Sequence, residues 1–141
     1  MQSPFNARGG RLSPDGRWLA YSSNESGRYE VYVVPYPGPG GKWQVSTAGG
    51  GSLQWRADGK ELFFQGADQS IMAVDVRAGA TFELGVPKPL FRMALTRGPY
   101  MGYRWAVSRD GQRFLVNTPS GAAAAGHLIV VTNWTAELGR K

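Results

Sequence analysis

The most informative segment of this chain reads Ser13-Pro14-Asp15-Gly16-Arg17-Trp18-Leu19-Ala20-Tyr21-Ser22. It recurs without gaps as Arg56-Ala57-Asp58-Gly59-Lys60-Glu61-Leu62-Phe63-Phe64-Gln65 and as Ser108-Arg109-Asp110-Gly111-Gln112-Arg113-Phe114-Leu115-Val116-Asn117. Because Gly tolerates a positive φ and Asp accepts hydrogen bonds from nearby backbone amides, Asp-Gly between two extended runs predicts a β-hairpin. We therefore interpret the three aspartates as turn residues rather than as metal ligands or acid–base groups.

The spacing of the copies indicates the architecture. Asp15 and Asp58 lie 43 positions apart, and Asp58 and Asp110 lie 52 apart. A repeat of about 40 to 45 residues is typical of a four-stranded β-propeller blade. The extra length before the third copy is assigned to a longer loop at 92–102. The chain is therefore predicted to be all-β, a single propeller segment over residues 1–141, with blades at about 10–47, 52–91 and 103–134.

Individual strands follow from short β-rich or alternating runs that flank each turn. They are predicted at 10–13, 18–23, 29–35 and 42–47, at 52–56, 61–65, 70–76 and 82–85, and at 103–108, 113–118 and 128–134. The outer strand at 82–85 is left open to extend toward Phe91. No window has a 3.6-residue period long enough for a stable helix. Alignment on the turns makes Leu12, Trp55 and Val107 equivalent core positions.

The segment 13–21 resembles the signature of TolB-like β-propeller repeats, which are related to WD-type repeats. The whole chain is also similar to the last blades of propellers at the C-terminal end of some bacterial serine/threonine protein kinases. That likeness rests on Gly27-Arg28-Tyr29-Glu30-Val31-Tyr32-Val33 and on Asn133-Trp134-Thr135. The resemblance implies a ring of six blades and, through the kinase-linked proteins, an extracytoplasmic location. It bears on the fold more than on function, because propellers have many roles.

Three blades are too few to close a ring, since propellers have roughly four to eight. We therefore expect a twofold homodimer that completes six blades, because closed symmetric dimers are the commonest assemblies. Residues 1–5 precede the first inner strand as 42–47 precede the second. They are therefore predicted to form an outer strand on the partner's third blade. The alternative is a fragment that depends on further blades of a longer chain.

Composition limits the classes of function. The 141 residues carry a net charge of +6, but the 16 Lys and Arg residues are scattered singly, which argues against nucleic-acid binding. No apolar run is long enough to span a membrane. The chain has no Cys and therefore no disulfide and no Cys-based metal site. The compartment stays undetermined from composition.

The candidate binding site is the mouth of the central channel. Loops at the end opposite the Asp-Gly turns carry Arg8, Arg97, Tyr100 and His127, and inner strands supply Arg11, Gln54 and Arg104. Arg presents a fork that suits carboxylate or phosphate, so this mouth suits a small anionic ligand, a peptide end or a protein. The sequence is thus consistent with a non-catalytic binding or scaffold module. The alternative interpretation is that these side chains are solvated or pair with Glu25 and Asp68.

Two further functions are left open. In a weak or promiscuous hydrolase at the dimer axis, His127 would act as base or metal ligand, assisted by Asp68 or Glu25. No nucleophile elbow, phosphate-binding loop or H-E-x-x-H motif supports catalysis. No cofactor and no metal-ligand set are predicted, although a metal ion in the channel is left open. The third function is that of an engineered or fragmentary ring-forming structural protein.

Overall fold

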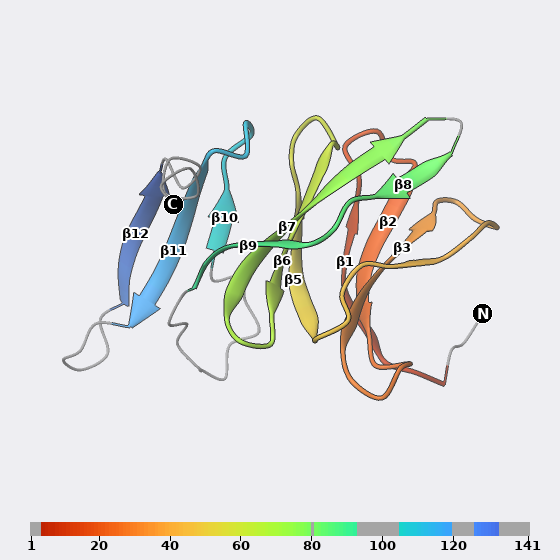
Figure 1. Cartoon of the computed structure of the whole chain (residues 1–141), viewed down its shortest axis with the longest axis horizontal. Helices are drawn as coiled ribbons and strands as arrows, with labels where there is room; N and C mark the ends of the chain where they lie inside the picture. The colour runs from red at the N-terminus through yellow and green to blue at the C-terminus, as the bar shows by residue number, and fades with distance from the viewer. Residues whose placement is uncertain (1–3, 80, 93–104, 120–125, 133–141) are drawn as a thin grey trace.

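The computed structural model describes residues 4–79, 81–92, 105–119 and 126–132, and in the last two ranges it describes the side chains of 105–116 and 130. The regular structure of these ranges is β, arranged in three antiparallel sheets that stand side by side (Figure 1). Each sheet corresponds to one predicted blade, which confirms the all-β prediction. The described ranges hold no helix long and apolar enough to cross a membrane.

Blade two lies between blades one and three (Figure 1). Blade one has the order β1-β2-β3-β4, with β1 at Ala7–Leu12, β2 at Trp18–Ser23, β3 at Glu30–Pro35 and β4 at Trp43–Gln44. Blade two contains β5 at Gly50–Trp55, β6 at Glu61–Gly66, β7 at Ser70–Ala78, β8 at Phe82–Leu84 and β9 at Lys88–Arg92. Blade three contains β10 at Trp105–Val107, β11 at Arg113–Pro119 and β12 at Gly126–Thr132.

The inner strand of blade one begins earlier than predicted. β1 starts at Ala7, before the predicted start at residue 10, and its pairing with β2 shifts register between Arg8 and Arg11. Gly9 has a φ of +67° at this irregularity, a conformation that glycine adopts without steric penalty. The structure also differs from the prediction at Leu12. This residue is 48% exposed, so its prediction as a core position is wrong in the described chain.

The outer strands also differ from the predicted ranges. β4 ends at Gln44 rather than at residue 47, because Ser46 uses its hydroxyl to accept from the Val31 N–H at 2.8 Å and to donate to Glu30. The outer position of blade two is divided between β8 and β9, which pair with opposite ends of β7. Of the N-terminal segment predicted to swap, Pro4 and Phe5 form a bend, and residues 1–3 lie outside the described residues. The swap therefore stays a prediction.

The first Asp-Gly turn shows why this residue pair recurs. Asp15 Oδ1 accepts from the Ser13 hydroxyl at 2.6 Å and from the Arg17 N–H at 3.1 Å. The bond from Ser13 is the main reason that the pKa of Asp15 is lowered. Gly16 follows with a φ of +72°. The third copy repeats this arrangement with Ser108, Asp110, Gly111 and Gln112.

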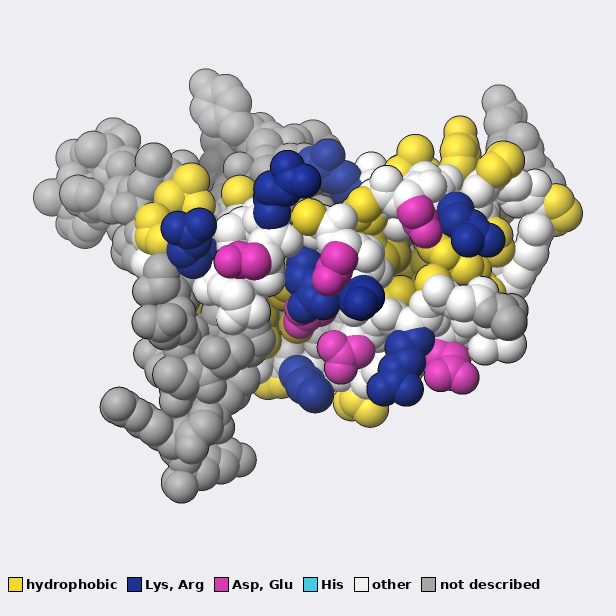
Figure 2. Space-filling view, turned by 90° about the horizontal axis from the view of Figure 1, so that it is seen from above, with side chains coloured by type: hydrophobic (Ala, Val, Ile, Leu, Met, Phe, Trp, Pro, Cys, Tyr) yellow, Lys and Arg dark blue, Asp and Glu magenta, His cyan; other side chains and the backbone are white. Residues whose placement is uncertain are grey.

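In the second turn an arginine replaces the serine. Arg56 Nε donates to Asp58 Oδ1 at 2.8 Å, and Arg56 Nη1 donates to Glu61 Oε2 at 2.9 Å. Burial raises the pKa of Glu61, whereas the bond from Arg56 lowers that of Asp58. Figure 2 looks onto this end of the molecule and shows Lys and Arg side chains interspersed with Asp and Glu across its middle. The turn end is thus a surface of mixed charge.

Two apolar seams hold the blades together, and blade two contributes one face of its sheet to each. The first seam contains Ala20, Val31, Val33 and Val45 of blade one and Leu53, Leu62, Phe64, Val74, Val76 and Phe82 of blade two. The second contains Phe63, Ile71, Ala73 and Leu90 of blade two and Trp105, Phe114 and Val116 of blade three. Adjacent residues Phe63 and Phe64 enter different seams, because successive side chains of a strand point to opposite faces.

The turn glycines allow a direct test of packing between blades. Gly16 and Gly111 have nearly the same φ, but a Cβ on Gly16 meets nothing within 4 Å, whereas one on Gly111 meets Arg56 Cδ at 2.8 Å and Phe63 Cζ at 3.3 Å. We expect Gly16→Ala to cost about 1 kcal/mol of unfolding free energy from backbone strain. Gly111→Ala should cost about 2–4 kcal/mol, because overpacking adds to the same strain. Urea unfolding of the two variants measures the difference, and equal losses would contradict packing of the turns.

Candidate functional site

A hollow of about 450 Å³ opens where the three inner strands meet. Its described lining comes from β1, β5 and β10 and from the first turn: Arg11, Leu12, Pro14, Gln54, Trp55, Trp105 and Ala106. These residues lie toward the Asp-Gly end of the inner strands. The hollow is therefore at the opposite end of the strands from the predicted channel mouth.

Gln54 and Trp55 join the inner strands across the blades. Gln54 Nε2 donates to the Trp105 carbonyl at 2.6 Å, and its Oε1 accepts from the Val107 N–H at 3.2 Å. Trp55 Nε1 donates to the Arg11 carbonyl at 3.0 Å. Gln54 thus places β10 against β5, while its predicted contact with a ligand stays a prediction.

Arg11 gives the hollow its charge. It is the only charged residue among the described residues that line it, and its side chain is exposed. The lining also includes two tryptophans, Trp55 and Trp105. A guanidinium beside aromatic walls suits a carboxylate or phosphate carried on an apolar body. The structure therefore brings together Arg11 and Gln54 of the predicted set.

Trp105 lines the hollow, but its indole N–H is buried. The residue is 3% exposed, and its indole N–H has no acceptor among the described residues. An indole nitrogen can only donate, and buried polar groups are normally hydrogen-bonded. The sequence predicts Trp105 within the strand at 103–108, which β10 confirms, but sequence reasoning did not identify it as a site residue.

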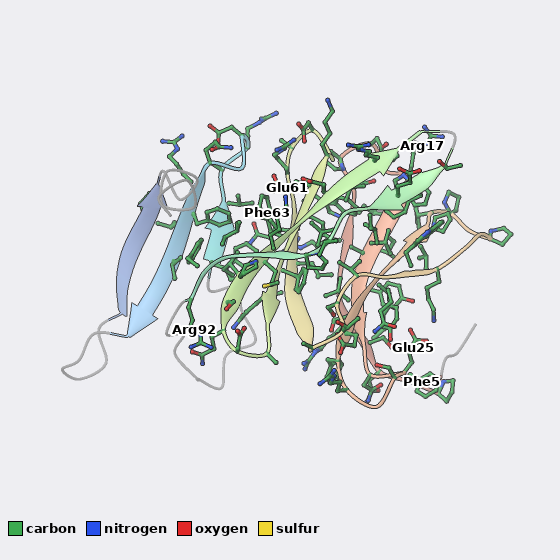
Figure 3. The ribbon with its side chains drawn as sticks, viewed as in Figure 1. Phe5, Arg17, Glu25, Glu61, Phe63 and Arg92 are labelled. Atoms are coloured by element: carbon green, nitrogen blue, oxygen red, sulfur yellow. The ribbon has the colours of Figure 1, made fainter. Side chains whose placement is uncertain are left out.

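The side chains predicted at the other end have partners of their own. Arg8 lies in β1 rather than in a loop, and its guanidinium carbon stacks 3.6 Å from the Tyr29 ring centroid. Lys42 Nζ donates to Glu25 at 2.5 Å, and this bond raises the pKa of Lys42. Figure 3 places Glu25 at the end of the molecule opposite Glu61.

Asp68 also has hydrogen-bond partners of its own within the described chain. It accepts from the Ser70 N–H and the Ser70 hydroxyl, both at 3.0 Å, and lies 3.5 Å from Arg92. The bonds from Ser70 lower the pKa of Asp68, which disfavours a proton-donating role near neutral pH. The backbone of His127 pairs with Thr118 within blade three. Its side chain and the whole of Arg97, Tyr100 and Arg104 lie outside the described residues, so the predicted rim and the hydrolase arrangement stay predictions.

No metal-ligand cluster is found in the part of the chain that the structure describes. No three His, Asp or Glu side chains there are close enough together to hold an ion. The carboxylates nearest the turns are each engaged locally, as Asp15, Asp58 and Asp110 demonstrate. The described site residues thus suit binding through a cation and hydrogen-bond donors.

Comparison with known proteins identifies the fold. No protein-family model and no curated protein matches the sequence. Among solved structures, TolB from Acinetobacter baumannii is similar with a TM-score of 0.62 and 18% sequence identity. The match covers 90% of this chain and 29% of the TolB chain. The chain therefore has the fold of part of a TolB-type β-propeller.

Proposed function

We propose that this chain is a non-catalytic binding module whose hollow at Arg11 takes a carboxylate, either at the end of a peptide or on a small organic anion. The observation that carries the proposal is that Arg11 is the one charged residue among the described residues lining a hollow of about 450 Å³, whose lining also includes two tryptophans. Ligand sites in proteins are commonly concave, largely apolar and supplied with a few polar groups that orient the ligand.

The chemistry of the lining favours an acceptor-bearing ligand. Arg11 offers a charged fork of N–H donors at the hollow. No described lining residue is acidic, so an anion meets no like charge within the hollow. A carboxylate would be oriented by Arg11, while the body of the ligand would pack on the Trp55 ring.

Binding is tested with two defined probes. A short peptide with a free C-terminal carboxylate and citrate are titrated against the 141-residue chain, and tryptophan fluorescence and calorimetry report binding. The same peptide as its C-terminal amide tests the requirement for the carboxylate. We expect Arg11→Gln to weaken peptide binding at least tenfold, since hydrogen bonds to a charged group contribute roughly 1.5–3 kcal/mol.

Arg17→Gln is the matched control. Arg17 is an exposed arginine of the same blade, located on the first turn and not part of the lining, and its substitution removes the same charge. Its affinity for the peptide should stay within twofold of the original. Equal losses of affinity in the two variants would show only the general attraction of an anion to a chain with a net charge of +6. Equal affinity for the peptide and its amide would contradict recognition of the carboxylate.

A further inference from the structure

The repeat allows each blade face to be compared at equivalent positions. Aligned on the Asp-Gly turns, Ala20, Phe63 and Leu115 occupy the same site of the second strand. Ala20 and Phe63 are 0% exposed because the next blade covers them, whereas Leu115 is 41% exposed. The open face of blade three therefore has a side chain that the preceding blades bury.

The neighbouring strand shows the same contrast. Val33, Ala73 and Val130 are the cross-strand partners of those three residues. Val33 is 0% exposed and Ala73 is 5% exposed, but Val130 is 57% exposed. Leu115 and Val130 thus form an apolar pair on the outer face of blade three. We call this pair and Ala106, whose strand partner is Leu115, the trailing face.

Blade one has the complementary open face. Leu19, Leu62 and Phe114 are equivalent, and the last two are 0% exposed under the preceding blade, while Leu19 is only partly buried. Leu12, the strand partner of Leu19, is 48% exposed. Leu12, Leu19 and Tyr21 are called the leading face. They correspond in position to residues that blades two and three bury or half-bury against their predecessors.

The turns repeat this pattern. A Cβ on Gly59 would lie 3.6 Å from Pro14 of the preceding turn, and one on Gly111 would lie 2.8 Å from Arg56. At Gly16 a Cβ would meet nothing within 4 Å. Each turn thus packs on its predecessor except the first. The trailing face and the leading face thus correspond to the two sides of the same type of seam.

We propose that the trailing face of one chain docks on the leading face of a second copy, and that the reverse contact closes a twofold dimer. The occupant is a second copy because its leading face supplies the positions that the seam between blades two and three uses. In that seam the Phe63 and Phe114 rings are 5.2 Å apart, and their equivalents at the open faces are Leu115 and Leu19. Two such contacts join six blades, within the roughly four to eight that close a ring.

Light scattering tests the assembly on the unmodified chain. At tens of micromolar the mass should be twice the 15.3 kDa of one chain. Leu115→Glu should give a monomer, because a carboxylate would be buried in each seam. Val86→Glu adds the same charge at a residue that is 78% exposed in the loop between β8 and β9, and it should leave the dimer intact. A monomeric unmodified chain would overturn the proposal and would favour closure by other blades of a longer protein.

Cross-linking tests which faces meet. Because the chain has no native cysteine, Leu19→Cys and Leu115→Cys introduce single thiols. A mixture of the two variants, treated with a short bismaleimide, should yield covalent dimers at least tenfold faster than either variant alone. A mixture of Leu19→Cys with Val86→Cys should link no faster than the single variants. Equal rates in the two mixtures, or a ladder of higher oligomers, would contradict the closed pairing of these faces.

Discussion

Replacing Phe63 by alanine should lower the free energy of unfolding by about 3–5 kcal/mol, the usual loss for a fully buried phenylalanine. Phe63 is 0% exposed and meets Phe114 edge to face, with ring centroids 5.2 Å apart. It also supports the third turn, since a Cβ on Gly111 would lie 3.3 Å from its ring. Loss of the ring therefore leaves a cavity in the seam between blades two and three. Urea unfolding followed by tryptophan fluorescence measures the change.

Val86→Ala is the control for this prediction. Val86 is 78% exposed, so its truncation should change stability by no more than about 0.5 kcal/mol. Both variants need the same protein concentration, because association of copies would raise apparent stability. A loss below about 1.5 kcal/mol for Phe63→Ala would show that blade three contributes little to the cooperative unit, since a well-packed ring should cost more.

Replacing Glu30 by alanine should cost about 3 kcal/mol, because two buried donors would lose their acceptor. Glu30 is 1% exposed, although it is ionisable. Its carboxylate accepts from Arg28 Nε at 2.7 Å, from the Gly49 N–H at 2.9 Å and from the Ser46 hydroxyl. These bonds tie the end of blade one to the loop that leads into blade two. Denaturant unfolding again provides the measurement.

A graded series separates the hydrogen bonds of Glu30 from its volume. Glu30→Gln keeps the shape and one acceptor oxygen, so it should lose about half as much stability as Glu30→Ala. Glu83→Ala removes an exposed carboxylate from β8 and should be nearly neutral. If Glu30→Gln and Glu30→Ala were equally harmless, the carboxylate would not anchor the loop between the blades.

Much of the fold was predictable because its signals are local. An Asp-Gly pair needs only its own neighbours to form a turn, and the bonds around Asp15 recur around Asp110 as the repeat implies. The period then predicts blades, and the similarity to TolB confirms that architecture. Arg56 in place of a serine was visible in the alignment, but its second bond to Glu61 depends on side-chain reach across the turn.

The candidate site was predictable only in part. Arg11 and Gln54 were identified from their register on the inner strands, and the structure places both in the same hollow. That hollow lies at the turn end of the strands, because the lining residues Leu12 and Pro14 adjoin the first turn. Trp105 was overlooked, since a tryptophan in a strand is indistinguishable from an ordinary core residue until the structure shows that its N–H has no acceptor among the described residues.

The sequence alone determined that the chain is all-β and built from three repeated hairpin-based blades, because turn chemistry and strand alternation act over a few residues. Only the tertiary structure decided which side chains join the blades. The bonds of Gln54 to β10 span more than fifty positions, and Glu30 reaches a loop nineteen positions away. Contacts at such separations depend on how the sheets stack. The structure likewise distinguished Leu115 from its buried equivalents, because exposure of that position depends on whether another blade follows it.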